Sequence, residues 1–177
     1  MERKFKWISG GISLAVIAIS VMAFTTLAHS DESCNYCGMS KAKFGHSWVV
    51  IENEKGTKGV CSIHCAAIDM ALNIDSPIKK MTVGDYNTKN QIDADKAYWV
   101  IGGDKGGVMT MRAKWAFQTK DAADAFIKAH GGKPAIFDDV MKAAFEDMYA
   151  DTLMIHKKRQ MMKKTDLFRR AAALNHP

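Results

Sequence analysis

The stretch that decides the fold runs from Ser47 to Leu72 and reads SWVVIENEKGTKGVCSIHCAAIDMAL. Residues 47–52 and 58–61 have the pattern of β-strands, being rich in β-branched residues and bounded by turn residues. Asn53-Glu54-Lys55-Gly56 supplies the polar, glycine-containing turn between them. The first part of the stretch therefore predicts a β-hairpin.

The second part of the stretch predicts a helix over residues 63–72. Its apolar residues recur at helical spacing: Ala67, Ile68, Ala71 and Leu72. An extended pattern returns at residues 80–83, which gives the order strand, strand, helix, strand.

The same order recurs further along the chain, after a loop rich in Asp and Asn. Strands are expected at residues 97–101, 114–118 and 135–137, with a helix at 121–130. Thr119 is a suitable cap for that helix, and Gly131 is a suitable stop.

These patterns predict an α+β fold in which two similar ββαβ modules, about residues 34–84 and 97–137, form one body spanning residues 29–137. A long C-terminal helix is expected from residue 138 to about residue 173, within a C-terminal segment 138–177 that ends in a basic tail. Only the first half of that helix has an apolar face.

Residues 1–28 are expected to form a hydrophobic helix that is a signal peptide or a membrane anchor. A basic start is followed by about 21 residues without a charge, from Trp7 to Leu27, which is long enough to cross a bilayer core of roughly 30 Å. Thr26-Leu27-Ala28 offers a small-residue cleavage site. Both alternatives place the rest of the chain outside the cytoplasm, in the periplasm or on the extracytoplasmic face of the membrane.

The net charge of +6 is concentrated at the two ends of the chain. Residues 1–28 carry +2, residues 151–177 carry +5, and residues 29–150 carry −1. A body that is nearly neutral, with no aromatic residues interleaved among basic ones, argues against nucleic acid as a partner.

The motif Cys34-Asn35-Tyr36-Cys37-Gly38-Met39 places two thiols and a thioether within six residues. In an exported protein, four Cys residues are compatible with disulfides that only stabilise the fold. A thiol-disulfide oxidoreductase is a further alternative. It is disfavoured because the residues after Cys37 do not predict a helix, whose N-terminus would lower the pKa of a thiol.

A second cluster, Cys61-Ser62-Ile63-His64-Cys65, lies where the hairpin ends and the helix begins. Together with Cys34 and Cys37 it has the composition of a four-Cys zinc site. Zinc gains little from a neighbouring thioether, whereas copper(I) prefers thiolate and thioether ligands.

A glycine-rich loop, residues 102–111, carries two more thioethers, Met109 and Met111. Glycines allow the backbone to approach a ligand closely, so this loop is a candidate source of copper ligands. Met161 and Met162, beside Lys163, are expected on the surface as a weak accessory copper site.

The chain resembles NosL and NosL-like proteins in an ordered series of motifs between about Cys34 and Phe137. These are the Cys34-Asn-Tyr-Cys37-Gly-Met39 element, Ala97-Tyr-Trp-Val-Ile-Gly102, Gly106-Gly-Val-Met109, Trp115-Ala-Phe117 and the helix from Asp121 to His130-Gly131-Gly132. The chain departs from that pattern in lacking a lipoprotein box and in having the Cys61-His64-Cys65 cluster and the basic C-terminal helix.

The resemblance implies a non-enzymatic, exported copper(I) chaperone for nitrous oxide reductase assembly. It implies copper ligation by Cys37, Met39 and Met109, to which we add Cys34 as an additional or exchange ligand. Met111, Cys61, His64 and Cys65 are secondary candidates, and zinc is the alternative metal. The expected partner is a client copper enzyme or its assembly machinery, together with the membrane if residues 1–28 are retained.

Overall fold

The computed structural model describes residues 32–174 of the chain. The hydrophobic helix predicted within residues 1–28 and its cleavage site lie outside the described residues. Within residues 32–174, none of the helices combines the length and apolar character needed to cross a membrane.

The first sheet is antiparallel and has the strand order β2-β1-β3-β4. Its strands are β1 (Val49–Asn53), β2 (Gly56–Val60), β3 (Ile78–Gly84) and β4 (Gln91–Asp93). Alternate residues of β1 are buried, as expected for a sheet with one face on the core. Helix α2 (Ile63–Leu72) follows β2 and occupies the residues predicted for it.

The second sheet is also antiparallel and has the order β6-β5-β7. It consists of β5 (Tyr98–Ile101), β6 (Lys114–Phe117) and β7 (Lys133–Ala135), with helix α3 (Lys120–His130) between β6 and β7. The hydroxyl of Thr119 accepts a hydrogen bond from the amide of Ala122 at 3.3 Å. Gly131, with φ of 74°, ends the helix in a backbone conformation that favours glycine.

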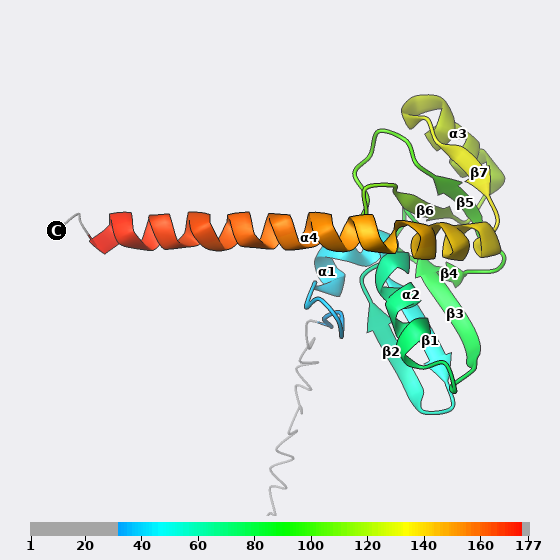
Figure 1. The fold of residues 1–177 in the computed structure, drawn as a ribbon. Helices are drawn as coiled ribbons and strands as arrows, with labels where there is room; N and C mark the ends of the chain where they lie inside the picture. Colours follow the sequence, from blue (N-terminus) through cyan, green and yellow to red (C-terminus); the bar gives the residue numbers. More distant parts are fainter. Residues whose placement is uncertain (1–31, 175–177) are drawn as a thin grey trace, which may run out of the picture.

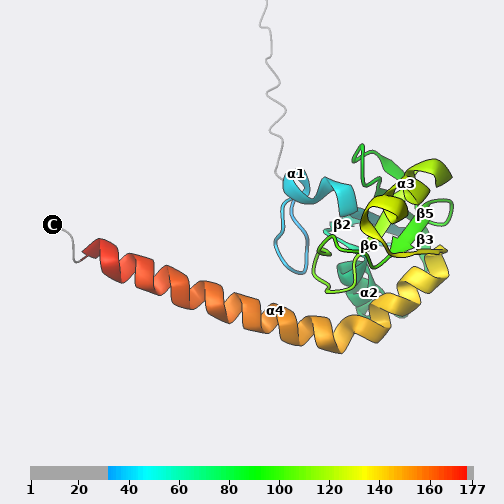
Figure 2. The same ribbon diagram turned by 90° about the horizontal axis from the view of Figure 1, so that it is seen from above.

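Helix α4 (Phe137–Leu174) crosses the body next to α2 and then projects away from it (Figures 1 and 2). Its first half supplies buried residues, the last of which is Asp151. The described residues of its second half are largely exposed. Short helical segments, α1 (Lys41–Phe44) and the 3₁₀ turn η1 (Gly45–Ser47), precede β1.

The predicted α+β class is confirmed, with two antiparallel sheets and a long C-terminal helix. The strand predicted at 135–137 was wrong by two residues: β7 is Lys133–Ala135, and Phe137 already begins α4. Pro134 is compatible with β7 because β7 is an edge strand. The interpretation of the two halves as copies of one ββαβ module stays a prediction.

Buried aromatic side chains fill the interior and join the two sheets. Trp48, Trp99 and Phe117 are essentially inaccessible to solvent. Tyr86, between β3 and β4, packs on Trp115 and Phe117 of β6 with ring centroids 5.0 and 5.6 Å apart. The two sheets therefore share one core rather than forming separate domains.

Asp85 is the polar connection between the sheets. Its buried carboxylate accepts hydrogen bonds from the amides of Asn87 and Thr88, from the Thr88 hydroxyl and, across the junction, from the amide of Gln118 at 2.8 Å. Burial raises the pKa of Asp85, but the hydrogen bonds from Thr88 and Gln118 outweigh it and leave this pKa below its ordinary value.

We expect Asp85→Ala to lower the free energy of unfolding at neutral pH by about 2–3 kcal/mol, because four hydrogen-bond donors lose the buried carboxylate that accepts from them. Because the pKa of Asp85 is lower in the folded state, the carboxylate stabilises the fold at pH values above about 3.9, its pKa in the unfolded chain. This stabilisation is lost as the pH falls towards the pKa of the folded state. Denaturant titrations of the wild type and the variant at pH 7 and pH 3 measure the loss of stability and its dependence on pH. An equal deficit of the variant at the two pH values would contradict this role.

Candidate metal centre

The first pair of cysteines lies in a tight turn closed by backbone hydrogen bonds. The amide of Cys34 donates to the carbonyl of Met39 at 2.8 Å, and the amide of Gly38 donates to the carbonyl of Cys34 at 2.9 Å. Gly38 has φ of 75°, which a side chain would oppose. The amides of Tyr36 and Met39 donate hydrogen bonds to the sulfurs of Cys34 and Cys37, respectively, so the turn supports negative charge on both thiols.

Tyr36, between the two cysteines, fastens this turn to helix α2. Its hydroxyl donates a hydrogen bond to the buried carboxylate of Asp69, which also pairs with Lys58 at 2.8 Å. Burial and the hydrogen bond to Asp69 raise the pKa of Tyr36 to about 12, so the phenol keeps its proton. Because α2 also carries Cys65, this contact holds the first cysteine pair against the second.

The second pair lies at the start of α2, where Cys61 ends the hairpin and Cys65 is the third helical residue. The hydroxyl of Ser47 donates to the carbonyl of Cys61 at 2.8 Å and fixes this corner. Positive potential at a helix N-terminus favours thiolates placed there.

All four sulfurs gather in one cluster, whose members lie within 4.8 Å of one another (Cys34, Cys37, Cys61 and Cys65). The sulfur of Cys37 is 3.3 Å from that of Cys61, which is 3.6 Å from that of Cys65. Tetrahedral binding with metal–sulfur bonds of about 2.3 Å places sulfurs about 3.8 Å apart. The four-thiol cluster is therefore close to the dimensions of a site for one soft metal ion.

The four thiols form hydrogen bonds with one another, and these shift their pKa values. Hydrogen bonds from Cys37, Cys61 and Cys65 lower the pKa of Cys34, whereas hydrogen bonding to Cys34 and Cys37 raises the pKa of Cys61 and of Cys65. The hydrogen bond with Cys34 raises the pKa of Cys37, but those from Cys61 and Cys65 bring it to about 7. Without a cation the cluster cannot ionise fully, and binding a metal here releases protons.

Cys37 differs from the other three because it is only half-buried and opens into a cavity of about 510 Å³. Met39 and Met109 line the same cavity. The structure thus brings together the three residues expected from the resemblance, and Cys34 lies beside Cys37 in the cluster. Nitrogen and sulfur groups line this cavity, but no carboxylate from the described residues does.

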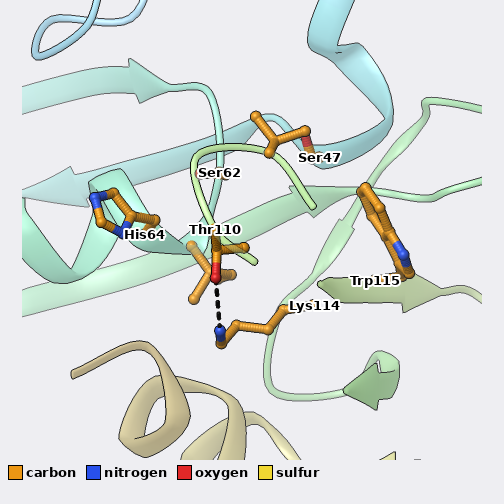
Figure 3. Close-up of a pocket in the computed structure, with 8 residues that line it drawn as sticks. Ser47, Ser62, His64, Thr110, Lys114 and Trp115 are labelled. Atoms are coloured by element: carbon orange, nitrogen blue, oxygen red, sulfur yellow. Dashed lines mark hydrogen bonds between the residues drawn. The ribbon is translucent and has the colours of Figure 1, made fainter. Parts of the chain in front are cut away.

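Met109 projects from the loop between β5 and β6 with a strained backbone, since its φ is 61°. Two residues later, the amide of Met111 donates to the buried carboxylate of Asp151 on α4 at 2.9 Å. Lys114, at the end of the loop, donates to the Thr110 hydroxyl (Figure 3) and to Asp147 of α4 at 2.7 Å. Helix α4 therefore holds this loop in the conformation that exposes Met109 to the cavity.

Two other candidates lie outside this cavity, although His64 lines a smaller hollow together with Cys37 and Cys65. Met111 is 72% exposed and does not line the cavity. His64 is buried, and its Nδ1 atom lies 3.4 Å from the Asp151 carboxylate. Burial lowers the pKa of His64 more than the negative charge of Asp151 raises it, so the imidazole is neutral at neutral pH. Their roles as ligands stay predictions.

Sequence reasoning missed the contribution of α4 to this cavity. Met154, Ile155, Lys158, Arg159 and Met162 form one of its walls. The sequence predicts Met162, with Met161, as a weak accessory copper site on the surface, and it assigns no metal-binding role to Met154. These five residues recur on one face of the helix, which the sequence alone shows. Nothing in the sequence indicates that this face of α4 lies next to Cys37.

The chain is similar to the copper chaperone NosL from Shewanella denitrificans, whose crystal structure matches with 25% identity and a TM-score of 0.52 over 63% of this chain and 90% of that chain. The solution structure of the apo-NosL protein from Achromobacter cycloclastes matches with 28% identity and a TM-score of 0.37 over 51% of this chain and 82% of that chain. The search of curated proteins gave no match. A family model described as NosL matches residues 26–145, and the chain therefore belongs to the NosL family.

Proposed function

We propose that this protein is a non-enzymatic copper(I) chaperone that binds its cargo at Cys37. The position of Cys37 supports this proposal, because Cys37 belongs to the four-thiol cluster and also opens into the cavity lined by Met39 and Met109. Copper(I) is a soft ion that prefers these thiolate and thioether ligands.

The arrangement suits transfer of the ion rather than permanent storage. Cys37 supplies a charged thiolate, Met39 and Met109 supply neutral thioethers, and Cys34 supplies an exchange ligand. Because the cavity leaves room beside Cys37, an incoming ligand is able to join before a bound one leaves. Thioethers do not form disulfides, so these two ligands persist in an oxidising compartment.

The proposed site of action is the extracytoplasmic face of the membrane or the periplasm. The uncharged segment between Trp7 and Leu27 supports export, as a cleaved signal or as a retained anchor. The relative from Shewanella denitrificans is a copper chaperone. The proposed client is an exported copper enzyme, such as nitrous oxide reductase, or its assembly machinery.

A structural zinc site is the second candidate, because four thiols within 4.8 Å of one another suit tetrahedral zinc. In that case the cysteines only stabilise the fold, as they would in a disulfide-linked domain. A thiol-disulfide oxidoreductase has less support. Residues 35–37 form a turn and not the start of a helix that would activate Cys34.

The proposal is tested by titrating the full chain with copper(I) under anaerobic conditions against a chromophoric competitor. Wild-type protein is expected to bind copper(I) tightly, and Met109→Leu is expected to weaken binding at least about tenfold, the equivalent of about 1.4 kcal/mol. Exchange of Met for Leu conserves volume, so the metal-free variant should unfold within about 1.5 kcal/mol of the wild type.

Met111→Leu is the matched control, because Met111 lies in the same loop but outside the cavity. It is expected to leave copper(I) affinity unchanged. Failure of the wild-type chain to compete for copper(I) would overturn the proposed function. Equal losses in the two variants would overturn the role of Met109.

A further inference from the structure

The part of α4 that lines the cavity lies beyond the region matched by the family model, which ends at residue 145. Met154, Ile155, Lys158, Arg159 and Met162 all line the cavity of about 510 Å³ into which Cys37 opens. Their spacing places them along one face of the helix over two turns. This chain therefore adds a helical wall to the proposed copper site.

The same helix also reaches the four-thiol cluster itself. A smaller hollow of about 160 Å³ is lined by Cys37 and Cys65 from the cluster, by Met109, and by Ile155 and Arg159 of α4, among others. The helix is held in this position by the contacts of Asp147 and Asp151 with the Met109 loop. The wall is thus fixed relative to Cys37 and Met109.

The chemistry of this wall favours a soft, singly charged ion. Lys158 and Arg159 repel cations, and they repel a divalent ion more strongly than a monovalent one. A carboxylate or thiolate placed beside them would form an ion pair, whereas a thioether is neutral and stays available as a ligand. Of the α4 residues that line this cavity, Met154 and Met162 are therefore the ones able to bind a metal, and copper(I) is the ion that accepts thioethers.

We propose that Met154 and Met162 are additional copper(I) ligands, which together with Met39 and Met109 make the cavity an entry site leading to Cys37. This inference rests on the proposed function and extends it to residues outside the matched family region. Copper stays in the +1 state throughout, and apart from bonds to the metal the one bond that breaks is the S–H bond of Cys37, whose proton leaves to solvent. A thioether of α4 joins the ion as it arrives and stays bound when the thiolate of Cys37 joins it.

The test uses the full chain labelled with ¹³C at the methionine methyl groups and titrated anaerobically with copper(I). The methyl resonances of Met154 and Met162 are expected to shift, each being assigned by its loss on replacement with leucine. Met161 is the matched control. It is adjacent to Met162, is 51% exposed and does not line the cavity, so its resonance is expected to stay in place.

The double variant Met154→Leu/Met162→Leu is expected to bind copper(I) at Cys37 with affinity reduced about tenfold, while Met161→Leu binds like the wild type. If the wild type binds copper(I) but the double variant has wild-type affinity and neither resonance shifts, this inference is overturned and the proposed function stands. If the wild type binds no copper(I), the proposed function fails, and the inference fails with it.

Discussion

A chain carrying Cys37→Ser is expected to lose tight copper(I) binding, with a fall in affinity of at least about a thousandfold, the equivalent of about 4 kcal/mol. Cys37 is the cluster thiol that lines the cavity of about 510 Å³, so its loss leaves that cavity without a thiolate. A serine hydroxyl is a hard oxygen ligand for which copper(I) has little preference. Anaerobic competition titration of the full chain measures the loss.

Cys65→Ser is the informative control for this variant. Cys65 belongs to the same cluster but is fully buried and does not line the larger cavity. We expect Cys65→Ser to bind copper(I) within about tenfold of the wild type. Equal and complete loss in both variants, with tight zinc in the wild type, would show a four-thiolate zinc site and would contradict the assignment of copper to Cys37.

Asp151→Ala is expected to lower the free energy of unfolding by about 2–4 kcal/mol and to weaken copper(I) binding as well. The carboxylate of Asp151 is buried, accepts the amide of Met111 at 2.9 Å and faces Nδ1 of His64 at 3.4 Å. Removing it leaves the Met111 amide without its acceptor and releases the strained loop that holds Met109. Urea denaturation and copper(I) titration of the same preparation measure the two effects.

Two controls distinguish this connection from a general effect of charge. Asp151→Asn retains an oxygen that accepts the Met111 amide, so it should be less destabilising and should keep most of the copper(I) affinity. Asp166 is exposed on the projecting half of α4, and Asp166→Ala should change neither quantity. An Asp151→Ala protein with wild-type stability would contradict the role given to this carboxylate.

Elements with a strong apolar pattern were predictable from the sequence, and elements defined by tertiary pairing were not. Helix α2 occupies the residues that the helical period predicted, but of the four apolar residues behind that prediction only Ala67 is buried, because the helix packs mainly through residues 63–67. Strand β4 was missed because its residues, Gln91–Asp93, are mostly polar and are strand only through pairing with β3. Helix α1, with four residues, is too short to show a period.

The composition of the candidate site was predictable, but its assembly was not. The spacing of Cys34 and Cys37 indicates that their sulfurs converge, but the approach of Cys61 and Cys65 depends on the contact between Tyr36 and Asp69 of α2. The part played by α4 depends on pairing between Asp151 and the Met109 loop, across 40 positions. Neither contact leaves a local pattern in the sequence.

Copper(I) is expected to be bound at Cys37 by sulfur alone. X-ray absorption at the copper K edge distinguishes sulfur ligands from nitrogen and oxygen ligands. The sample is the full chain, purified anaerobically and loaded with one equivalent of copper(I). We expect a copper(I) edge with only sulfur bound to the metal. Cys65→Ser is expected to give the same spectrum, and Cys37→Ser is expected to lose it. Nitrogen or oxygen ligands in the first shell, or a chain that retains zinc and takes up no copper(I), would contradict it.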